Sequence, residues 1–216
     1  MPCCCSIAGA SAERQFSEKR AAQDLAQYRS KGPGATARLL LAGLAEAGPV
    51  EGRLLDIGSG IGSLTFELLD RGLTSAIGVD LSSAYVSAAL DEAVRRGRSG
   101  AVEFVHGDFV DVAGRIPRAD VVTLDRVVCC YADCERLLDE SLRHAERFMA
   151  LSCPRDVWYV RIWIRLQNAW RQIRGNSFRT FIHSTAAMES KIRGTRFELL
   201  RRSRTRTWCA DVYVRP

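Results

Sequence analysis

The stretch "LLDIGSGIGSLTFELL", residues 54–69, decides the fold of this 216-residue chain. A short apolar run leads into Asp56, glycines follow at alternate positions (Gly58, Gly60 and Gly62), and a helical pattern begins directly after them. Glycine lets the backbone turn sharply and approach a ligand, and the start of the next helix offers free N–H groups. The stretch therefore suits a nucleotide-binding turn, although a tight structural connection would use the same spacing.

Beyond this turn, apolar runs alternate with helical patterns. The runs lie at 53–57, 76–80, 102–108, 119–125 and 147–153, and the helical patterns at 62–71, 82–97, 133–146 and 184–194. Strands separated by helices of roughly 10–15 residues indicate βαβ units and a parallel sheet. Residues 196–206 and 207–215 read as two final strands that pair antiparallel, because only a short turn separates them. We therefore expect an α/β fold with a mostly parallel seven-stranded sheet, an antiparallel C-terminal strand and helices on both faces.

Two further carboxylates follow apolar runs at the places where those runs end. Asp80 ends "AIGVD", 20 residues after Gly60, and Asp108 follows "VHG". An acid at the end of the second strand can accept hydrogen bonds from ribose hydroxyls, and open α/β sheets bind ligands at their carboxyl edge. Each acid alone could be a helix N-cap. Together with Asp56 and the glycine turn, they predict a binding site at this edge.

The motifs together resemble those of class I S-adenosylmethionine-dependent methyltransferases. "LLDIGSGIGS", "GVDLS", "HGDF" and "ADVVTLDRVV" are similar to the first four motifs of that superfamily, and the resemblance covers about residues 35–216. It implies a Rossmann-like class I methyltransferase fold, with S-adenosylmethionine as the cofactor. A dehydrogenase is the competing interpretation, but the dinucleotide pattern G-x-G-x-x-G is not met, because Ser63 stands at its last position.

The resemblance also implies roles for individual residues. The glycines would approach the amino-acid part of the cofactor, Asp56 would organise the turn and the cofactor amine, and Asp80 would hold the ribose. The adenine would lie near Leu81, Asp108 and Phe109, and Asp125 would complete the cofactor-binding set. No metal site is expected.

The motifs predict the cofactor better than the methyl acceptor. The Asn/Asp-Pro-Pro-aromatic signature of nucleic-acid amino methylases is missing, and its place holds "LDRV". Cys153, in "LSCPR", superficially resembles the nucleophile of cytosine-C5 enzymes, but a lone cysteine in an apolar strand is more often packing. We expect a small-molecule acceptor, acidic or aromatic. The alternatives are RNA and a non-catalytic, cofactor-binding partner subunit.

Candidate acceptor-side residues follow the fourth strand and precede the last helix. Histidine suits proton removal near neutral pH, which makes His183 a candidate base beside Asp125 and Tyr131, although a lone histidine is more often a cap. The predicted substrate-binding residues are Arg126, Cys129, Cys130, Tyr131, Trp158 and His183.

Residues 154–175, "PRDVWYVRIWIRLQNAWRQIRG", interrupt the alternation with a tryptophan- and arginine-rich helical pattern. Three interpretations stay open for this helix: a substrate lid, a plain helix with Trp158 and Trp170 in the core, or a helix on a membrane surface. The resemblance favours a lid over 154–183. We therefore divide the chain into an N-terminal tail and helix at 1–34, which would cover the cofactor and substrate, and a methyltransferase domain at 35–216.

The charge is unevenly distributed along the chain. Residues 150–216 contain 14 Lys/Arg and four Asp/Glu, whereas the whole chain contains 31 Lys/Arg and 25 Asp/Glu. This basic third could face an acidic molecule, RNA or an anionic membrane, or could simply be a solvated surface. No secretory signal or spanning run is evident, so we expect a cytoplasmic protein whose eight cysteines stay reduced.

The cysteines form two clusters, one at positions 3–5 and the other in "LDRVVCCYADC", residues 124–134. Adjacent cysteines point in different directions, so Cys129, Cys130 and Cys134 make a poor zinc site. Packing at the rim of the site is the preferred interpretation. Contact of a thiol with the substrate, and a structural metal or redox pair, are the alternatives.

Overall fold

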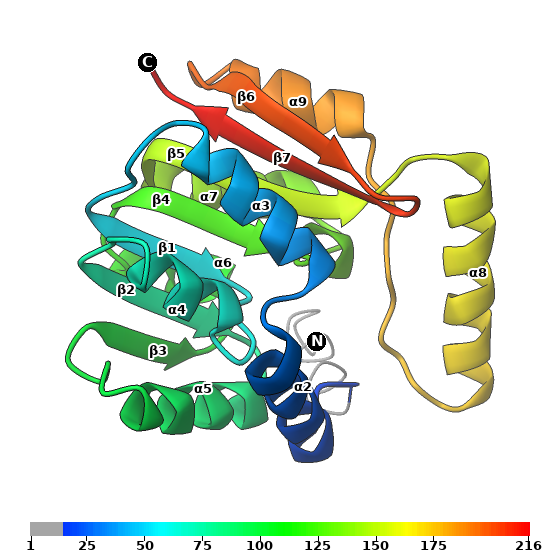
Figure 1. Ribbon diagram of the computed structural model, residues 1–216. Coiled ribbons are helices and arrows are strands. Elements are labelled where there is room, and N and C mark those ends of the chain that lie inside the picture. The colour runs from blue at the N-terminus through cyan, green and yellow to red at the C-terminus, as the bar shows by residue number, and fades with distance from the viewer. Residues whose placement is uncertain (1–14) are drawn as a thin grey trace.

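The protein is described here from a computed structural model that covers residues 15–216 (Figure 1). One seven-stranded sheet runs in the order β3-β2-β1-β4-β5-β7-β6. Every neighbouring pair is parallel except those of β7, which runs antiparallel to both β5 and β6. The strands are β1 Arg53–Ile57, β2 Ser75–Asp80, β3 Val102–His106, β4 Ala119–Asp125, β5 Ala145–Pro154, β6 Glu198–Arg204 and β7 Trp208–Val214. The predicted fold class, including its antiparallel C-terminal strand, is confirmed.

Helices cover both faces of the sheet because successive strand residues point to opposite sides. Leu54 and Val121 pack on one face, and their neighbours Leu55 and Val122 pack on the other. The first face is covered by α2 Glu18–Lys31, α3 Ala35–Ala45, α4 Ser63–Leu69 and α5 Ser83–Arg95. The second is covered by α6 Phe109–Val112, α7 Cys134–His144 and α9 Thr185–Arg193. The central strands are therefore buried on both sides, as their continuous apolar runs predict.

The helix expected over 154–175 is shorter than the sequence predicts. It is α8 Trp158–Ile173, because β5 continues to Pro154, which lies opposite Trp208 in β7. The N-terminal helix expected within residues 1–34 is α2, which begins at Glu18, and Cys3–Cys5 lie outside the described part of the chain.

Helix α8 stands away from the body of the domain (Figure 1). Only Val160 and Ile164 of its residues are buried, whereas Trp158 and Trp170 are 74% and 55% exposed. The interpretation that placed these two tryptophans in the core is therefore wrong. The inner side of α8 contacts the chain that returns from it, where Asn168 donates to the Thr180 carbonyl oxygen at 2.8 Å. None of the helices in residues 15–216 is long and apolar enough to cross a bilayer.

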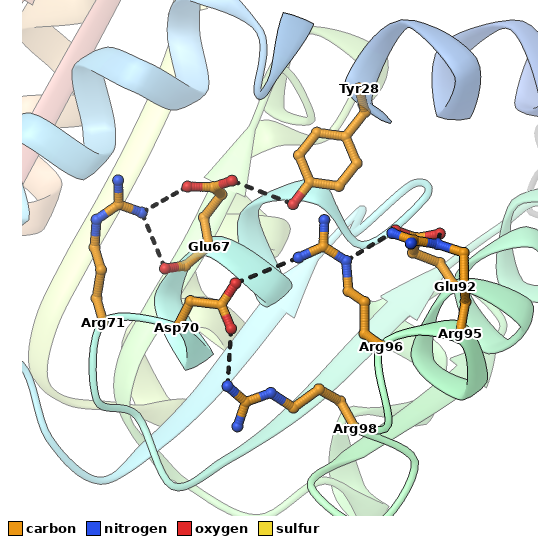
Figure 2. Close-up of polar contacts among 8 residues, drawn as sticks. All are labelled: Tyr28, Glu67, Asp70, Arg71, Glu92, Arg95, Arg96 and Arg98. Atoms are coloured by element: carbon orange, nitrogen blue, oxygen red, sulfur yellow. Dashed lines mark hydrogen bonds and ion pairs between the residues drawn. The ribbon is translucent and has the colours of Figure 1, made fainter. Parts of the chain in front are cut away.

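A charged cluster fastens α2 to the domain (Figure 2). The Glu92 side chain of α5 is fully buried under Arg95, Arg96 and Arg29, and the Arg29 contact, at 2.7 Å, comes from α2. The hydrogen bond from Arg95 and those from the other two guanidinium groups lower the pKa of Glu92 to about 2, so it stays ionised. The Tyr28 hydroxyl donates to Glu67 of α4 at 3.3 Å, and the Arg96 guanidinium lies 5.0 Å from the Tyr28 ring centre.

The two ends of the N-terminal segment have different surroundings. Tyr28, near the end of α2, is buried against Glu67 of α4 and Arg96 after α5. The segment before α2 approaches the carboxyl edge instead, as the contacts of Phe16 below show.

Candidate functional site

The glycine turn joins β1 to α4, and its glycines are required by close packing. Gly58 and Gly62 have positive φ angles of 66° and 76°. A Cβ at Gly58 would lie 2.3 Å from a methyl carbon of Val127, and one at Gly62 would lie 2.8 Å from the Phe66 ring. At Gly60 an added Cβ would meet only the Tyr85 ring, at an ordinary 3.4 Å. The turn thus packs tightly at its two ends, and the Tyr85 ring lies in ordinary contact with its middle glycine.

Asp56 lies beneath this turn, at 2% exposure. Its carboxylate accepts hydrogen bonds from Thr65 at 2.7 Å and from Thr123 at 2.6 Å, which join β1, α4 and β4. Burial raises the pKa of Asp56 to about 6, although both threonine hydroxyls favour the ionised form. Asp56 therefore organises the turn from below.

Asp80 connects the glycine turn to the end of β2. Its carboxylate accepts the Gly60 N–H and the Ser82 N–H, each at 2.8 Å. Ser82, and not Asp80, caps α5. These bonds hold an acceptor group at the carboxyl edge beside Gly60. Leu81 lies in the same bend, and its carbonyl oxygen contacts His106 at 3.1 Å.

Asp108 has the capping role that the sequence left open. It is the N-cap of α6, accepting the Val110 N–H at 3.0 Å, and it also accepts a hydrogen bond from the Tyr131 hydroxyl. Phe109 points into the core, where its ring centre lies 5.3 Å from that of His144. Phe109 therefore supports the site from below.

The loop after β4 brings several predicted acceptor-side residues together. Asp125 accepts the Ser152 hydroxyl at 2.5 Å, and the same hydroxyl oxygen accepts the Arg126 N–H at 2.9 Å. Burial raises the pKa of Asp125. Arg126 has a φ of 64°, a region that non-glycine residues seldom occupy and that clusters at functional sites. Its guanidinium group lies 5.1 Å from the ring centre of Trp208.

Two thiols follow Arg126 in this loop. The sulfur atoms of Cys129 and Cys130 lie 3.9 Å apart, and both contact the Arg126 carbonyl oxygen, at 3.4 and 3.6 Å. The hydrogen bond from Cys129 and the nearby charge of Arg126 lower the pKa of the Cys130 thiol, despite its burial. The partner Cys129 is buried and its pKa is raised.

His183 reaches the same loop from the other side, with Nε2 2.9 Å from the Tyr131 carbonyl oxygen. A carbonyl oxygen only accepts, so Nε2 carries the proton, and in the neutral ring Nδ1 is the acceptor. His183, Tyr131 and Asp108 thus form a chain of contacts across the edge of the sheet.

Aromatic residues that the sequence analysis missed cover this edge. Phe16 makes edge contacts with Tyr85 at 5.6 Å and with Phe178 at 5.5 Å, and its carbonyl oxygen accepts the Ser82 hydroxyl at 2.8 Å. Asn176 donates to Gln15 at 2.9 Å. Ser82 is recognisable as an N-cap, but no periodicity marks Phe16 or Phe178. The two segments are 160 residues apart and meet only in the folded chain.

Not every predicted residue joins this cluster. Trp158 lies at the outward start of α8, where its ring contacts Tyr159. Cys134, Cys153 and Cys209 are buried free thiols, and burial raises the pKa of Cys153 to about 12, which makes it a poor nucleophile. Within residues 15–216, no group of three or more cysteine, histidine or acidic side chains could hold a metal ion.

The donors and acceptors at this edge fit S-adenosylmethionine. The cofactor carries ribose hydroxyls and an adenine amine, and Asp80 and Asp108 provide acceptors at two neighbouring strand ends. Asp56 is buried and bonded to two threonines, so it supports the turn from below. The hydroxyl of Ser59, in the turn itself, is buried without a hydrogen-bond partner among the described residues.

Comparisons with known proteins agree with this geometry. Residues 55–147 match the family described as "Methyltransferase domain". A search of curated proteins finds no match. Magnesium protoporphyrin IX methyltransferase from Synechocystis PCC 6803, solved with bound SAH, is similar in structure, with a TM-score of 0.67, 18% identity, and coverage of 84% of this chain and 82% of that chain.

Two further solved structures show how widely this fold is shared. A protein described as a sarcosine dimethylglycine methyltransferase from Galdieria sulphuraria has a TM-score of 0.67 at 13% identity, covering 83% of this chain and 85% of its own. The [4+2]-cyclase SpnF has a TM-score of 0.62 at 18% identity, and the match covers 83% of this chain and 81% of the SpnF chain. At such identities the likeness establishes the fold.

Proposed function

We propose that this chain is a class I S-adenosylmethionine-dependent methyltransferase that methylates a small organic molecule at the carboxyl edge of its sheet. The match of residues 55–147 to the methyltransferase-domain family supports the proposal. One observation carries the proposal. On the acceptor side, His183 contacts Tyr131, whose hydroxyl donates to Asp108 on the cofactor side. The Gly107 N–H, next to Asp108, donates to the Asp80 carbonyl oxygen at 2.9 Å, so the two sides are joined.

On the cofactor side, the chain binds and orients. Asp80 accepts from the ribose hydroxyls, Asp108 accepts from the adenine amine, and Asp56 holds the turn against the amino-acid part. Tyr131 already donates to Asp108, so adenine binding exchanges or shares that hydrogen bond. The cofactor supplies a methyl group activated on a sulfonium, which leaves the protein to position the acceptor and exclude water.

On the acceptor side, the loop after β4 holds the substrate. Arg126 is exposed and suits a substrate carboxylate. Nδ1 of His183 accepts a proton from the acceptor group where the reaction requires proton removal. Asp125 and Tyr131 are the other candidate catalytic residues, and Cys129 and Cys130 line the rim beside them.

The cover of the site consists of two segments. Residues 15–34 lie over Ser82 and Tyr85, and residues 154–183 form a lid whose returning chain bonds to the loop after β4. The Phe181 N–H donates to the Cys129 carbonyl oxygen at 2.7 Å, and Phe178 meets Phe16. Such a cover keeps water from the transfer site.

Calorimetry with S-adenosylmethionine tests the cofactor assignment. Wild type should bind, Asp80→Ala should lose about tenfold or more in affinity, and Asp91→Ala, an exposed acid of the neighbouring α5, should bind as wild type does. Absence of binding by wild type, or equal binding by Asp80→Ala, would overturn the assignment.

Transfer of labelled methyl groups to fractionated small molecules and to RNA identifies the acceptor class. We expect labelling of a small molecule. Labelling of RNA alone, with binding that weakens steeply with salt, would favour the RNA alternative. Binding without any transfer would favour a non-catalytic partner.

We also propose a cytoplasmic location, because the five described cysteines are free thiols.

A further inference from the structure

The outward face of α8 is unusually apolar for a surface helix. Its exposed side chains recur at helical spacing, so that they form one stripe along the helix. Trp158, Ile162, Trp163, Leu166, Trp170 and Ile173 are 74%, 49%, 59%, 61%, 55% and 79% exposed, respectively. Three of the four tryptophans of the chain lie on this stripe. The helix projects from the domain (Figure 1). At 3.6 residues per turn, the stripe lies on the side of the helix opposite the buried Val160 and Ile164.

Arginines flank the stripe, and only Arg161 among them pairs with an acidic residue of the described chain. Arg161 and Arg165 lie one turn apart on one side, and Arg174 lies on the other, with its guanidinium group 4.3 Å from the Trp170 ring centre. From position 157 to position 188 the sequence contains five arginines and no Asp or Glu. Arg165 forms no ion pair with any described residue, and Arg161 pairs with Asp156, which precedes the helix.

The inner side of α8 is held by different residues from those on the stripe. Arg171 donates to Asn168 at 3.1 Å and to Thr180 at 2.9 Å, and Val160 and Ile164 are buried. The orientation of the helix is therefore set from the domain side. None of these contacts comes from the apolar stripe, which therefore needs a separate explanation.

We propose that α8 docks on the surface of an anionic phospholipid bilayer. Tryptophan prefers the headgroup level, where its ring is apolar on one side and its N–H is hydrated. An apolar stripe flanked by arginines lies in the plane of such a surface, with the guanidinium groups at the lipid phosphates. The charge complementarity selects anionic lipid, because the whole segment is basic and free of acids. The convex, projecting stripe suits a flat surface.

Vesicle binding by the full chain tests this proposal independently of methyl transfer. The probes are vesicles of phosphatidylcholine alone and of phosphatidylcholine with about one third phosphatidylglycerol. We expect sedimentation with the anionic vesicles only, together with a blue shift of tryptophan emission, since three of the four tryptophans lie on the stripe. No sedimentation, or equal sedimentation with both vesicles, would overturn it.

Two sets of variants separate the stripe from the flanking charges. Trp163→Ser with Leu166→Ser should weaken vesicle binding about tenfold or more, whereas Val94→Ser, a 70% exposed apolar residue of α5, should not. The double variant Arg165→Glu, Arg174→Glu should also weaken vesicle binding about tenfold or more. The control Arg38→Glu, Arg115→Glu, which changes the net charge equally, should weaken vesicle binding clearly less. Because all these positions are exposed, the variants should fold, and circular dichroism checks that they do.

Other occupants of the stripe give different results. A second copy of the chain predicts a dimer in light scattering that the Trp163→Ser, Leu166→Ser variant dissociates, without vesicle binding by wild type. RNA predicts retention of RNA that depends on Arg165 and Arg174, again without vesicle binding. Either result would overturn the bilayer proposal.

Discussion

Phe16 and Phe178 meet edge to face, with ring centres 5.5 Å apart, and this contact closes the N-terminal segment against the chain that returns from α8. Phe16 also contacts Tyr85, and its carbonyl oxygen accepts from Ser82, two residues after Asp80. The contact therefore joins the two segments that we propose as the cover of the site.

Replacing Phe178 with alanine should open this cover. An aromatic pair of this kind contributes about 1 kcal/mol beyond the area that it buries. We expect the Kd for S-adenosylmethionine to rise about tenfold and trypsin to cut faster at Arg171–Arg179. Phe181→Ala is the matched control, because the bond from residue 181 to Cys129 uses the backbone N–H. Equal effects of the two changes would count against a closing role for Phe178.

Asp56→Asn should make stability less sensitive to pH. The folded pKa of Asp56 is raised from 3.8 to about 6, so its favourable contribution is present below the unfolded value and is lost as pH rises through about 6. Wild type loses this contribution as pH rises, whereas the variant has none to lose. The unfolding free energy of the variant minus that of wild type should therefore increase by on the order of 2 kcal/mol from about pH 4 to about pH 7. Urea unfolding at both pH values measures this gain. The exposed Asp91→Asn should show no such trend, and a flat difference for Asp56→Asn would contradict the expectation.

Glu92→Gln should destabilise the attachment of α2. Three guanidinium groups lose their buried partner, and hydrogen bonds to charged groups contribute about 2 kcal/mol. The pKa of Glu92 in the folded protein is lowered to about 2. Its contribution to the unfolding free energy of wild type is therefore present above about pH 4.5 and is lost as pH falls toward 2. Thermal unfolding near neutral pH should show the loss.

The control for this change is Glu140→Gln, which removes a surface pair with Arg143. Such pairs contribute less than about 1 kcal/mol, so the melting temperature should barely move. If both variants behaved alike, the buried position of Glu92 would have no energetic consequence.

Cys130 should be the first of the five described cysteines to react with iodoacetamide. Its pKa is lowered by Cys129 and Arg126, whereas burial raises the pKa of Cys134, Cys153 and Cys209. Peptide mapping by mass spectrometry after brief labelling identifies the modified sulfur and separates it from positions 3–5. Saturating S-adenosylmethionine should slow the labelling if the thiol lies at the rim of the site. Faster labelling of Cys153 than of Cys130 would contradict this ordering.

The fold was predictable because its signals are local. Apolar runs of strand length, helical periods between them and glycines after "LLDI" follow from steric and solvation preferences within about 20 residues. The same locality placed Asp56, Asp80 and Asp108 at strand ends, and parallel strands bring those ends to one edge. The structure adds that Asp108 also caps α6 and bonds Tyr131, a pairing that joins β3 to the loop after β4.

The sequence by itself therefore determined the sheet, the cofactor family and the carboxylate positions, because these depend on residue type and spacing along the chain. The tertiary structure decided which distant segments meet: Phe16 with Phe178, His183 with Tyr131, and Arg29 with Glu92. It also decided that the tryptophans of α8 face outward. Amphipathic spacing shows that a helix has an apolar side, but what that side contacts is set by how the rest of the chain packs around it.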